Sequence, residues 1–251
     1  MKVLLVGGSG LVGSFSTPYL RKHHEIRVFD LVPPKHDVEF VKGSITDPEA
    51  VRRALDGVDT FVTVVMKSGM GGSHREHSVE QAVDNYQVNC LGMHVLLRTA
   101  HELGITNGIY TSTMSVHHRQ RRERYLSEDE VPLDGPNVYG LTKGFGERIC
   151  HYFAREFDMS LAVFRITGPR PRDRYIEDRK AQTMTPDGII RVIDEEDLAR
   201  AYIAGLEFVQ KAKGRCEVFF ISGDNEHESI DMTKAKELLE WRPETQDKLE
   251  I

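Results

Sequence analysis

Short apolar runs alternate along the chain with longer segments in which apolar residues recur every three or four positions. The short runs predict buried strands, and the longer segments predict amphipathic helices. Strands are predicted at 2–6, 26–30, 38–42, 59–65, 107–112, 160–166 and 216–221. Helices are predicted at 11–23, 47–56, 78–103, 136–158, 195–210 and 231–240. This alternation predicts βαβ units and therefore an α/β fold with a doubly wound, mostly parallel sheet.

Local signals support several of these boundaries. Asp47 followed by Pro48 is typical of a helix start, and Gly57 and Gly104 are typical of helix ends. Three regions rich in loop residues follow the carboxyl ends of strands, where ligands bind in open α/β sheets. These regions are 66–76, 117–135 and 167–188.

The length and composition fit one domain. A chain of 251 residues with 39% hydrophobic residues can form a single large core. We therefore expect one domain over 1–251, with a small C-terminal substrate-binding part. Its substrate-binding elements are expected mainly in 167–190 and 222–251.

A glycine-rich loop follows the first predicted strand. Glycines stand at 7, 10 and 13 in the stretch Gly-Gly-Ser-Gly-Leu-Val-Gly, between the strand at 2–6 and the helix that follows. Glycines in this context allow a tight turn, the approach of a pyrophosphate and close packing of the helix on the strand. The helix N-terminus also offers N–H groups and a positive dipole end to phosphates. The loop therefore predicts a Rossmann-type dinucleotide site.

Asp30 ends the second predicted strand, in the sequence window for an acidic residue that accepts a hydrogen bond from a ribose 2′-hydroxyl. No arginine follows directly, since the next residues are Leu31-Val-Pro-Pro. A carboxylate at this position repels a 2′-phosphate. The sequence therefore favours NAD over NADP; a strand-ending Asp that only caps a turn is the alternative.

Tyr139 and Lys143 are the candidate proton-transfer pair. Their spacing of four places both side chains on one face of the predicted helix 136–158. A nearby ammonium favours the phenolate and lowers the pKa of a tyrosine, which otherwise is near ~10. The pair can therefore exchange a proton with a substrate hydroxyl or carbonyl group.

Charge and composition exclude several function classes. The net charge of −6 argues against nucleic-acid binding, and the apolar runs are shorter than the ~18 residues that a membrane span needs. With no signal peptide expected, a cytoplasmic location is predicted. Cys90, Cys150 and Cys216 are scattered, which suits unpaired thiols in a reducing compartment. Four of the 11 histidines form adjacent pairs, at 23–24 and 117–118, and neighbours in sequence rarely share one metal ion, so no metal site is expected.

Six segments together resemble the extended branch of the short-chain dehydrogenase/reductase superfamily, the NAD-dependent epimerase/dehydratase family. These segments are Gly7–Gly13, Gly43–Asp47, Val88–Leu97, Ile109–Val116, Tyr139–Lys143 and Asp231–Pro243. The resemblance covers nearly the whole chain. The length and the stretch Tyr139–Glu147 are further similar to uronate dehydrogenases.

The resemblance implies a role for each matching residue. Tyr139 would be the acid/base, Lys143 would bind the nicotinamide ribose, and Thr113 would orient the substrate oxygen, with Ser112 and Ser115 as alternatives. The implied cofactor-binding residues are Gly7, Ser9, Gly10, Leu11, Val12, Gly13, Asp30, Ser44, Ile45, Val64, Val65, Met66, Asn89, Thr111, Ser112, Tyr139, Lys143 and Ile166. The implied substrate-binding residues are Thr113, Met114, Ser115, Thr167, Arg174 and Arg179.

Two basic segments bear on the substrate. Arginines are concentrated at 119–124 and 170–179 of a net-acidic chain, and guanidinium groups bind carboxylates and phosphates through paired hydrogen bonds. Arg174 or Arg179 is therefore a candidate for binding an acidic group, although solvated charge is an equal alternative.

We expect an NAD-dependent oxidoreductase that oxidises a hydroxyl of a small sugar or sugar acid. The alternatives are a nucleotide-sugar epimerase or dehydratase without net NAD turnover, and a non-catalytic NAD-binding sensor.

The predicted helices 78–103 and 136–158 also bear on assembly. The first carries more apolar surface than one sheet face needs, and members of the resembling family commonly dimerise through two such helices. A homodimer is therefore expected, and a monomer with well-buried helices is the alternative.

Overall fold

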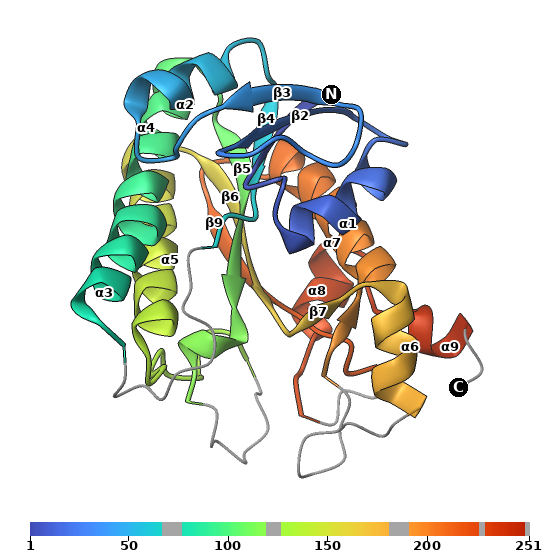
Figure 1. Ribbon diagram of the computed structural model, residues 1–251. Coiled ribbons are helices and arrows are strands. Elements are labelled where there is room, and N and C mark those ends of the chain that lie inside the picture. The colour runs from blue at the N-terminus through green and yellow to red at the C-terminus, as the bar shows by residue number, and fades with distance from the viewer. Residues whose placement is uncertain (67–76, 119–126, 181–190, 226–228, 249–251) are drawn as a thin grey trace.

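The computed structural model describes residues 1–66, 77–118, 127–180, 191–225 and 229–248, and it contains a seven-stranded parallel sheet (Figure 1). The strands are β1 (Lys2–Val6), β2 (Glu25–Asp30), β3 (Glu39–Lys42), β4 (Thr60–Thr63), β5 (Asn107–Thr113), β6 (Ser160–Ile166) and β9 (Cys216–Ile221). Their order is β3-β2-β1-β4-β5-β6-β9, and each neighbouring pair is parallel. The predicted fold class and all seven predicted strands are confirmed. The order reverses between β1 and β4, which is where ligands bind in such sheets.

Helices cover both faces of the sheet (Figure 1). On one face lie α1 (Leu11–Leu20), α7 (Glu195–Lys211) and α8 (Thr233–Leu238), and on the other α2 (Pro48–Leu55), α4 (Met93–Glu102) and α5 (Val138–Phe157). Each face has its own buried apolar cluster. The strands read as continuous apolar runs because both faces are covered; all seven residues of β6, for example, are buried.

The predicted caps are present. The Asp47 carboxylate accepts from the backbone N–H of Glu49 at 3.0 Å and of Ala50 at 3.2 Å. Gly57 and Gly104 have φ of +69° and +77°, the left-handed conformation that commonly ends a helix. Within the described residues, no helix is both long and apolar enough to cross a membrane.

The predicted helix 78–103 is interrupted. It consists of α3 (Val79–Tyr86), the π-helical segment η1 (Gln87–Gly92) and α4. The apolar pattern could not show this, because a single wide turn leaves the residues on either side helical. Such turns are frequent at functional sites.

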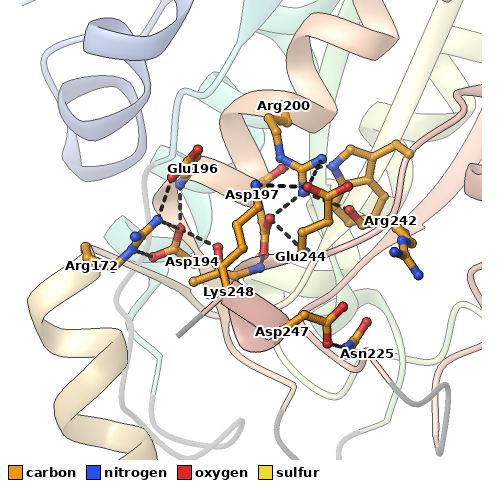
Figure 2. Close-up of polar contacts among 12 residues, drawn as sticks. Arg172, Asp194, Glu196, Asp197, Arg200, Asn225, Arg242, Glu244, Asp247 and Lys248 are labelled. Carbon is orange, nitrogen blue, oxygen red and sulfur yellow. Dashed lines mark hydrogen bonds and ion pairs between the residues drawn. The ribbon is translucent and has the colours of Figure 1, made fainter. Parts of the chain in front are cut away.

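The C-terminal part contains elements that the apolar pattern did not predict. Region 167–188, expected as a loop, contains β7 (Pro169–Arg170) and α6 (Arg172–Lys180); β7 pairs with β8 (Ile193–Asp194), and α9 (Thr245–Lys248) follows near the end. Helix α6 has no apolar stripe; it buries Tyr175 and is also held by ion pairs. Figure 2 shows Arg172 on Asp194 and Glu196, and the 244–248 segment held on α7 near Asp197. Residues 181–190, 226–228 and 249–251 of the predicted substrate-binding elements lie outside the described residues, and that assignment stays a prediction.

Candidate active site

The loop between β1 and α1 brings backbone close to backbone. Gly7 has φ of +83°, and a Cβ on it would lie 2.6 Å from Val65 Cα. A Cβ on Gly13 would lie 2.4 Å from Gly8 Cα. Neither position can carry a side chain, so the loop stays pressed against the end of β4 and against itself.

The space around Gly10 is less crowded than the space around Gly7 and Gly13. The nearest atom to a Cβ on Gly10 would be the Gly7 carbonyl oxygen at 3.3 Å. Gly10 is also the N-cap of α1 without a side-chain acceptor, and the first turn of α1, described in full, has no acidic residue. The first N–H groups of α1, at Leu11 and Val12, therefore suit a phosphate group. A pyrophosphate fits this cradle.

Asp30 is joined to the glycine loop. Its Oδ2 accepts from Ser9 N at 3.0 Å, its Oδ1 accepts from Leu31 N at 2.7 Å, and the Ser9 hydroxyl donates to Val32 O at 2.6 Å. A carboxylate has about four acceptor positions, so Asp30 retains capacity for a hydroxyl. The position fits the predicted contact with a ribose 2′-hydroxyl.

Lys143 lies buried where β4 and β5 end. Its Nζ donates to Thr111 O at 2.9 Å and to Val65 O at 3.1 Å, and it lies 4.8 Å from the centre of the Tyr110 ring. Burial lowers its pKa to about 8, so the ammonium predominates at neutral pH. Tyr139 lies one turn earlier in α5 and is half-buried. Tyr139 and Lys143 thus lie on one face of α5. The glycine loop comes close to this face at Val65, which lies against Gly7 and accepts from Lys143.

Thr113 is held against the start of α5. Its hydroxyl accepts from Ser115 N at 3.1 Å and so begins the short 3₁₀ segment η2 (Met114–Val116). A Cβ on Gly140 would lie 2.1 Å from Ser115 O, which shows how closely η2 packs on the turn that carries Tyr139. The structure therefore brings Thr113, Met114 and Ser115 to the start of α5.

The residues before Thr113 point to opposite sides of the sheet. The Thr111 hydroxyl bonds the Tyr202 hydroxyl of α7 at 3.0 Å, and the Ser112 hydroxyl donates to Glu147 of α5. Burial, and to a smaller extent the nearby Tyr139 phenol, raises the pKa of Tyr202. Because the Ser112 hydroxyl is engaged by Glu147, the remaining alternatives for holding a substrate oxygen are Thr113 and Ser115. Sequence analysis missed Tyr202 and Glu147; the position of Glu147, four residues after Lys143, was a usable signal.

Asn89 lies in η1 and faces α5. Its Nδ2 donates to Thr142 Oγ1 at 2.9 Å and to Asn85 Oδ1 at 3.2 Å. It thus contacts the residue directly before Lys143. The contact supports a structural role for Asn89 beside the predicted site.

The other predicted cofactor contacts lie at strand ends. Ser44 and Ile45 follow β3, Val64 and the exposed Met66 follow β4, and Ile166 ends β6. Thr167, a predicted substrate contact, follows Ile166 and is buried. All of these residues lie at the carboxyl edge of the parallel sheet, the same edge as Thr113.

The two candidate arginines differ in their surroundings. Arg174 is 61% exposed and pairs with two carboxylates of its own helix, Glu177 at 3.1 Å and Asp178 at 3.0 Å. Arg179 is half-buried and donates to the Tyr175 hydroxyl at 3.4 Å. Arg174 is thus exposed and paired within its own helix, whereas Arg179 is half-buried, and both stay candidates for binding an anionic group.

Among the described residues, no group of three or more His, Cys, Asp or Glu side chains could hold a metal ion. Cys90, Cys150 and Cys216 are free thiols. Burial raises the pKa of each of these thiols, so none is an activated nucleophile.

Known proteins share this fold. A structure titled UDP-glucose 4-epimerase superposes with a TM-score of 0.79 at 19% identity, over 97% of this chain and 92% of that one. A structure titled mutated uronate dehydrogenase superposes with a TM-score of 0.75 at 23% identity, over 99% of this chain and 84% of that one. At these identities the likeness shows the fold.

Sequence relatives match part of their own length. The uncharacterized protein y4nG of Sinorhizobium fredii is 33% identical over 172 residues, which are 64% of this chain and 39% of that protein. The chain spans less than half the length of the first curated relatives that it matches. Residues 3–211 match the NAD dependent epimerase/dehydratase family, whose members are NAD-dependent enzymes. With that match and the glycine loop, Tyr139 and Lys143 in place, this chain belongs to the NAD-dependent epimerase/dehydratase family.

Proposed function

We propose that the protein is an NAD-dependent oxidoreductase that oxidises a hydroxyl of a small sugar or sugar acid. The observation that carries this proposal is the buried Lys143 ammonium. It lies on the carbonyls of Thr111 and Val65, where β4 and β5 end, and one helical turn from Tyr139. Burial of a cation is unfavourable for stability, whereas a cation beside a phenol favours the phenolate and so assists proton transfer.

Each residue has a distinct role in the proposed reaction. NAD, when bound, would supply the acceptor for the hydride that leaves the substrate carbon. The Tyr139 oxygen takes the proton of the substrate hydroxyl, and the Lys143 ammonium stabilises the phenolate of Tyr139. The Thr113 hydroxyl, fixed by its bond from Ser115 N, holds the substrate oxygen.

The cofactor would be held by the elements at the β1/β4 switch point. The pyrophosphate would lie at Gly10 and the first turn of α1, the adenosine ribose at Asp30, and the adenine near Ser44 and Ile45. Asp30 would favour NAD over NADP, because a carboxylate repels a 2′-phosphate.

An acidic sugar is favoured by two observations. A uronate dehydrogenase structure superposes on nearly the whole chain, and Arg179 belongs to α6, which follows the carboxyl end of β6. We propose that Arg179 binds the carboxylate of such a substrate.

A nucleotide-sugar epimerase is the second candidate, supported by the superposed UDP-glucose 4-epimerase structure. It would use the same tyrosine and lysine and return the hydride. A non-catalytic NAD-binding sensor is the third candidate.

Steady NADH formation on a sugar panel separates the candidates. We expect absorbance at the NADH band to rise continuously with NAD and an acidic monosaccharide such as glucuronate. Interconversion of UDP-sugars without NADH would favour the epimerase. NAD binding by calorimetry with no turnover on either class would favour the sensor.

We further propose that two copies pack through α3 and α5. Large apolar side chains are exposed on these helices, and the rings of Tyr86 and Phe145, 6.2 Å apart, join them into one face. The exposed residues are Val79, Val83, Tyr86, Leu141, Phe145 and Tyr152. Such a face is self-complementary in a two-fold dimer. Light scattering at micromolar concentration should give the dimer mass, and Phe145→Asp should give the monomer; a monomeric unaltered protein would reject the proposal.

A further inference from the structure

A buried ion pair lies between α5 and β6, one helical turn beyond Lys143. Arg165 donates from Nη2 to Glu147 Oε2 at 2.8 Å and from Nε to Oε1 at 3.1 Å, and the two side chains are 5% and 2% exposed. The Ser112 hydroxyl of β5 donates to the same carboxylate. Glu147 therefore joins three elements: α5, β5 and β6.

Stability alone does not explain this pair. Two charges lose much hydration free energy on burial, and apolar residues of similar volume are often as stabilising. A charged group with several fixed hydrogen bonds does, however, set the relative position of the elements that it joins.

Three contacts fix the end of β5 against α5. Ser112 bonds Glu147, the Thr111 carbonyl accepts from Lys143, and the Ser115 carbonyl lies against Gly140. On α5 these contacts lie at successive turns, at Gly140, Lys143 and Glu147. On the β5 side they lie before and after Thr113, at Thr111, Ser112 and Ser115. The placement of Thr113 relative to Tyr139 thus depends on contacts at both ends.

We infer that Glu147, through its bond from Ser112, is a positioning residue that sets Thr113 against Tyr139 and Lys143. The inference rests on the proposed function, since it concerns the same proton-transfer group. Ser112, an alternative substrate contact in the sequence analysis, has its hydroxyl on Glu147, so neither residue is placed in contact with substrate here.

Glu147 also acts on the charge of Lys143. The groups that face Lys143 are Glu147, Cys150 and Tyr139 from α5, the Tyr110 ring from β5, and the Val65 carbonyl after β4. Burial lowers the Lys143 pKa to about 8, while the charges of Cys150 and Glu147 oppose that shift.

Near neutral pH, the opposing charge is that of Glu147. Burial raises the pKa values of Cys150 and Tyr110 well above their ordinary values, so both stay neutral. The Glu147 carboxylate therefore helps to keep Lys143 protonated.

The first experiment compares Ser112→Ala with Ser160→Ala. Ser160 is also buried in a neighbouring strand, and its hydroxyl donates to Ala212 O at 2.8 Å, at the opposite edge of the sheet. Both variants lose one buried hydroxyl, and Ser112→Ala keeps the Arg165–Glu147 pair. We expect Ser112→Ala to lower kcat about 10- to 100-fold, because misplaced reacting groups cost rates of this order. Ser160→Ala should keep kcat. An unchanged Kd of Ser112→Ala for NAD, measured by calorimetry, would support the positioning role, whereas a weakened Kd would indicate the cofactor contact that the family resemblance implies for Ser112 and would overturn that role.

The second experiment is the pH profile of Glu147→Gln with NAD and glucuronate, or with the sugar acid that gives the highest rate. Loss of the carboxylate lowers the Lys143 pKa further, so the alkaline limb of kcat should move to lower pH. A purely structural loss would lower kcat at every pH and leave the limb in place. Circular dichroism checks that the variant is folded; if it is not, the serine comparison decides.

The outcomes separate the two proposals. If Tyr139→Phe keeps its rate, the proposed function fails and the positioning role fails with it. If Tyr139→Phe is inactive while Ser112→Ala equals Ser160→Ala in kcat, the proposed function stands and the role of Glu147 is refuted.

Discussion

The cofactor side and the C-terminal side of this protein are held together in different ways. On the cofactor side, backbone meets backbone: Gly7 N donates to Phe29 O at 2.8 Å, and Gly7 and Gly13 leave no room for a side chain. On the C-terminal side, charged side chains form the contacts (Figure 2). Asp194 and Asp197 are both buried there, and they hold α6 and the segment 244–248.

The two sides differ in how strictly each contact requires a particular residue type. A close backbone approach admits glycine alone at its position, as at Gly13 against Gly8 and at Gly7 against Val65. The C-terminal contacts depend instead on charged and polar side chains that meet across the fold, such as Thr245 and Asp194.

The largest expected effect is at the junction of the two sides. Tyr139→Phe removes the phenol that carries the proton, so kcat should fall about 10²–10⁴-fold. NAD should still bind, since the cofactor side is intact. Steady-state kinetics and calorimetry measure the two effects, and a variant with near-normal kcat would exclude Tyr139 as the acid/base.

Asp197→Ala tests the C-terminal side. Asp197 accepts from Glu244 N and Thr245 N, each at 3.0 Å, and pairs with Arg200. Loss of this buried carboxylate should lower the free energy of unfolding by about 3 kcal/mol in a urea titration.

Asp247→Ala is the control for that measurement. Asp247 is exposed and accepts one bond, from Asn225, so its loss should cost less than about 0.5 kcal/mol. If Asp197→Ala were as mild as the control, the C-terminal side would not depend on its charges, and the contrast between the two sides would fail.

Asp30→Ala tests the cofactor side through the preference for NAD over NADP. The unaltered protein should prefer NAD in kcat/KM, and the variant should narrow the gap to NADP about tenfold, because the carboxylate no longer repels the 2′-phosphate. An NADP preference in the unaltered protein would contradict the assigned role of Asp30.

The smallest effect is expected at the arginines of α6. Arg179→Ala should raise KM for an acidic sugar about fivefold, as for one partly exposed ion pair, and should leave KM for a neutral analogue unchanged. Arg174→Ala is the matched control, because Arg174 already pairs with Glu177 and Asp178. Equal KM values for both variants and the unaltered protein would remove the proposed anion site.

The sequence by itself determined the features that follow local rules. The seven strands, the glycine loop, the Asp47 cap and the stops at Gly57 and Gly104 all come from short-range patterns. Spacing alone likewise placed Tyr139 and Lys143 on one helix face. Each of these features depends on residues within one element or one turn.

Only the tertiary structure decided which side chains meet. It turned Ser112 to Glu147 and Thr111 to Tyr202, paired Arg172 with Asp194, and inserted a wide turn at 87–92. The helix α6 has no apolar stripe, and it is joined to the rest of the protein by the buried Tyr175 and by the pairing of Arg172 with the distant Asp194. The physical reason is that the partner of a polar side chain depends on how the layers pack, and apolar periodicity carries no information about that partner.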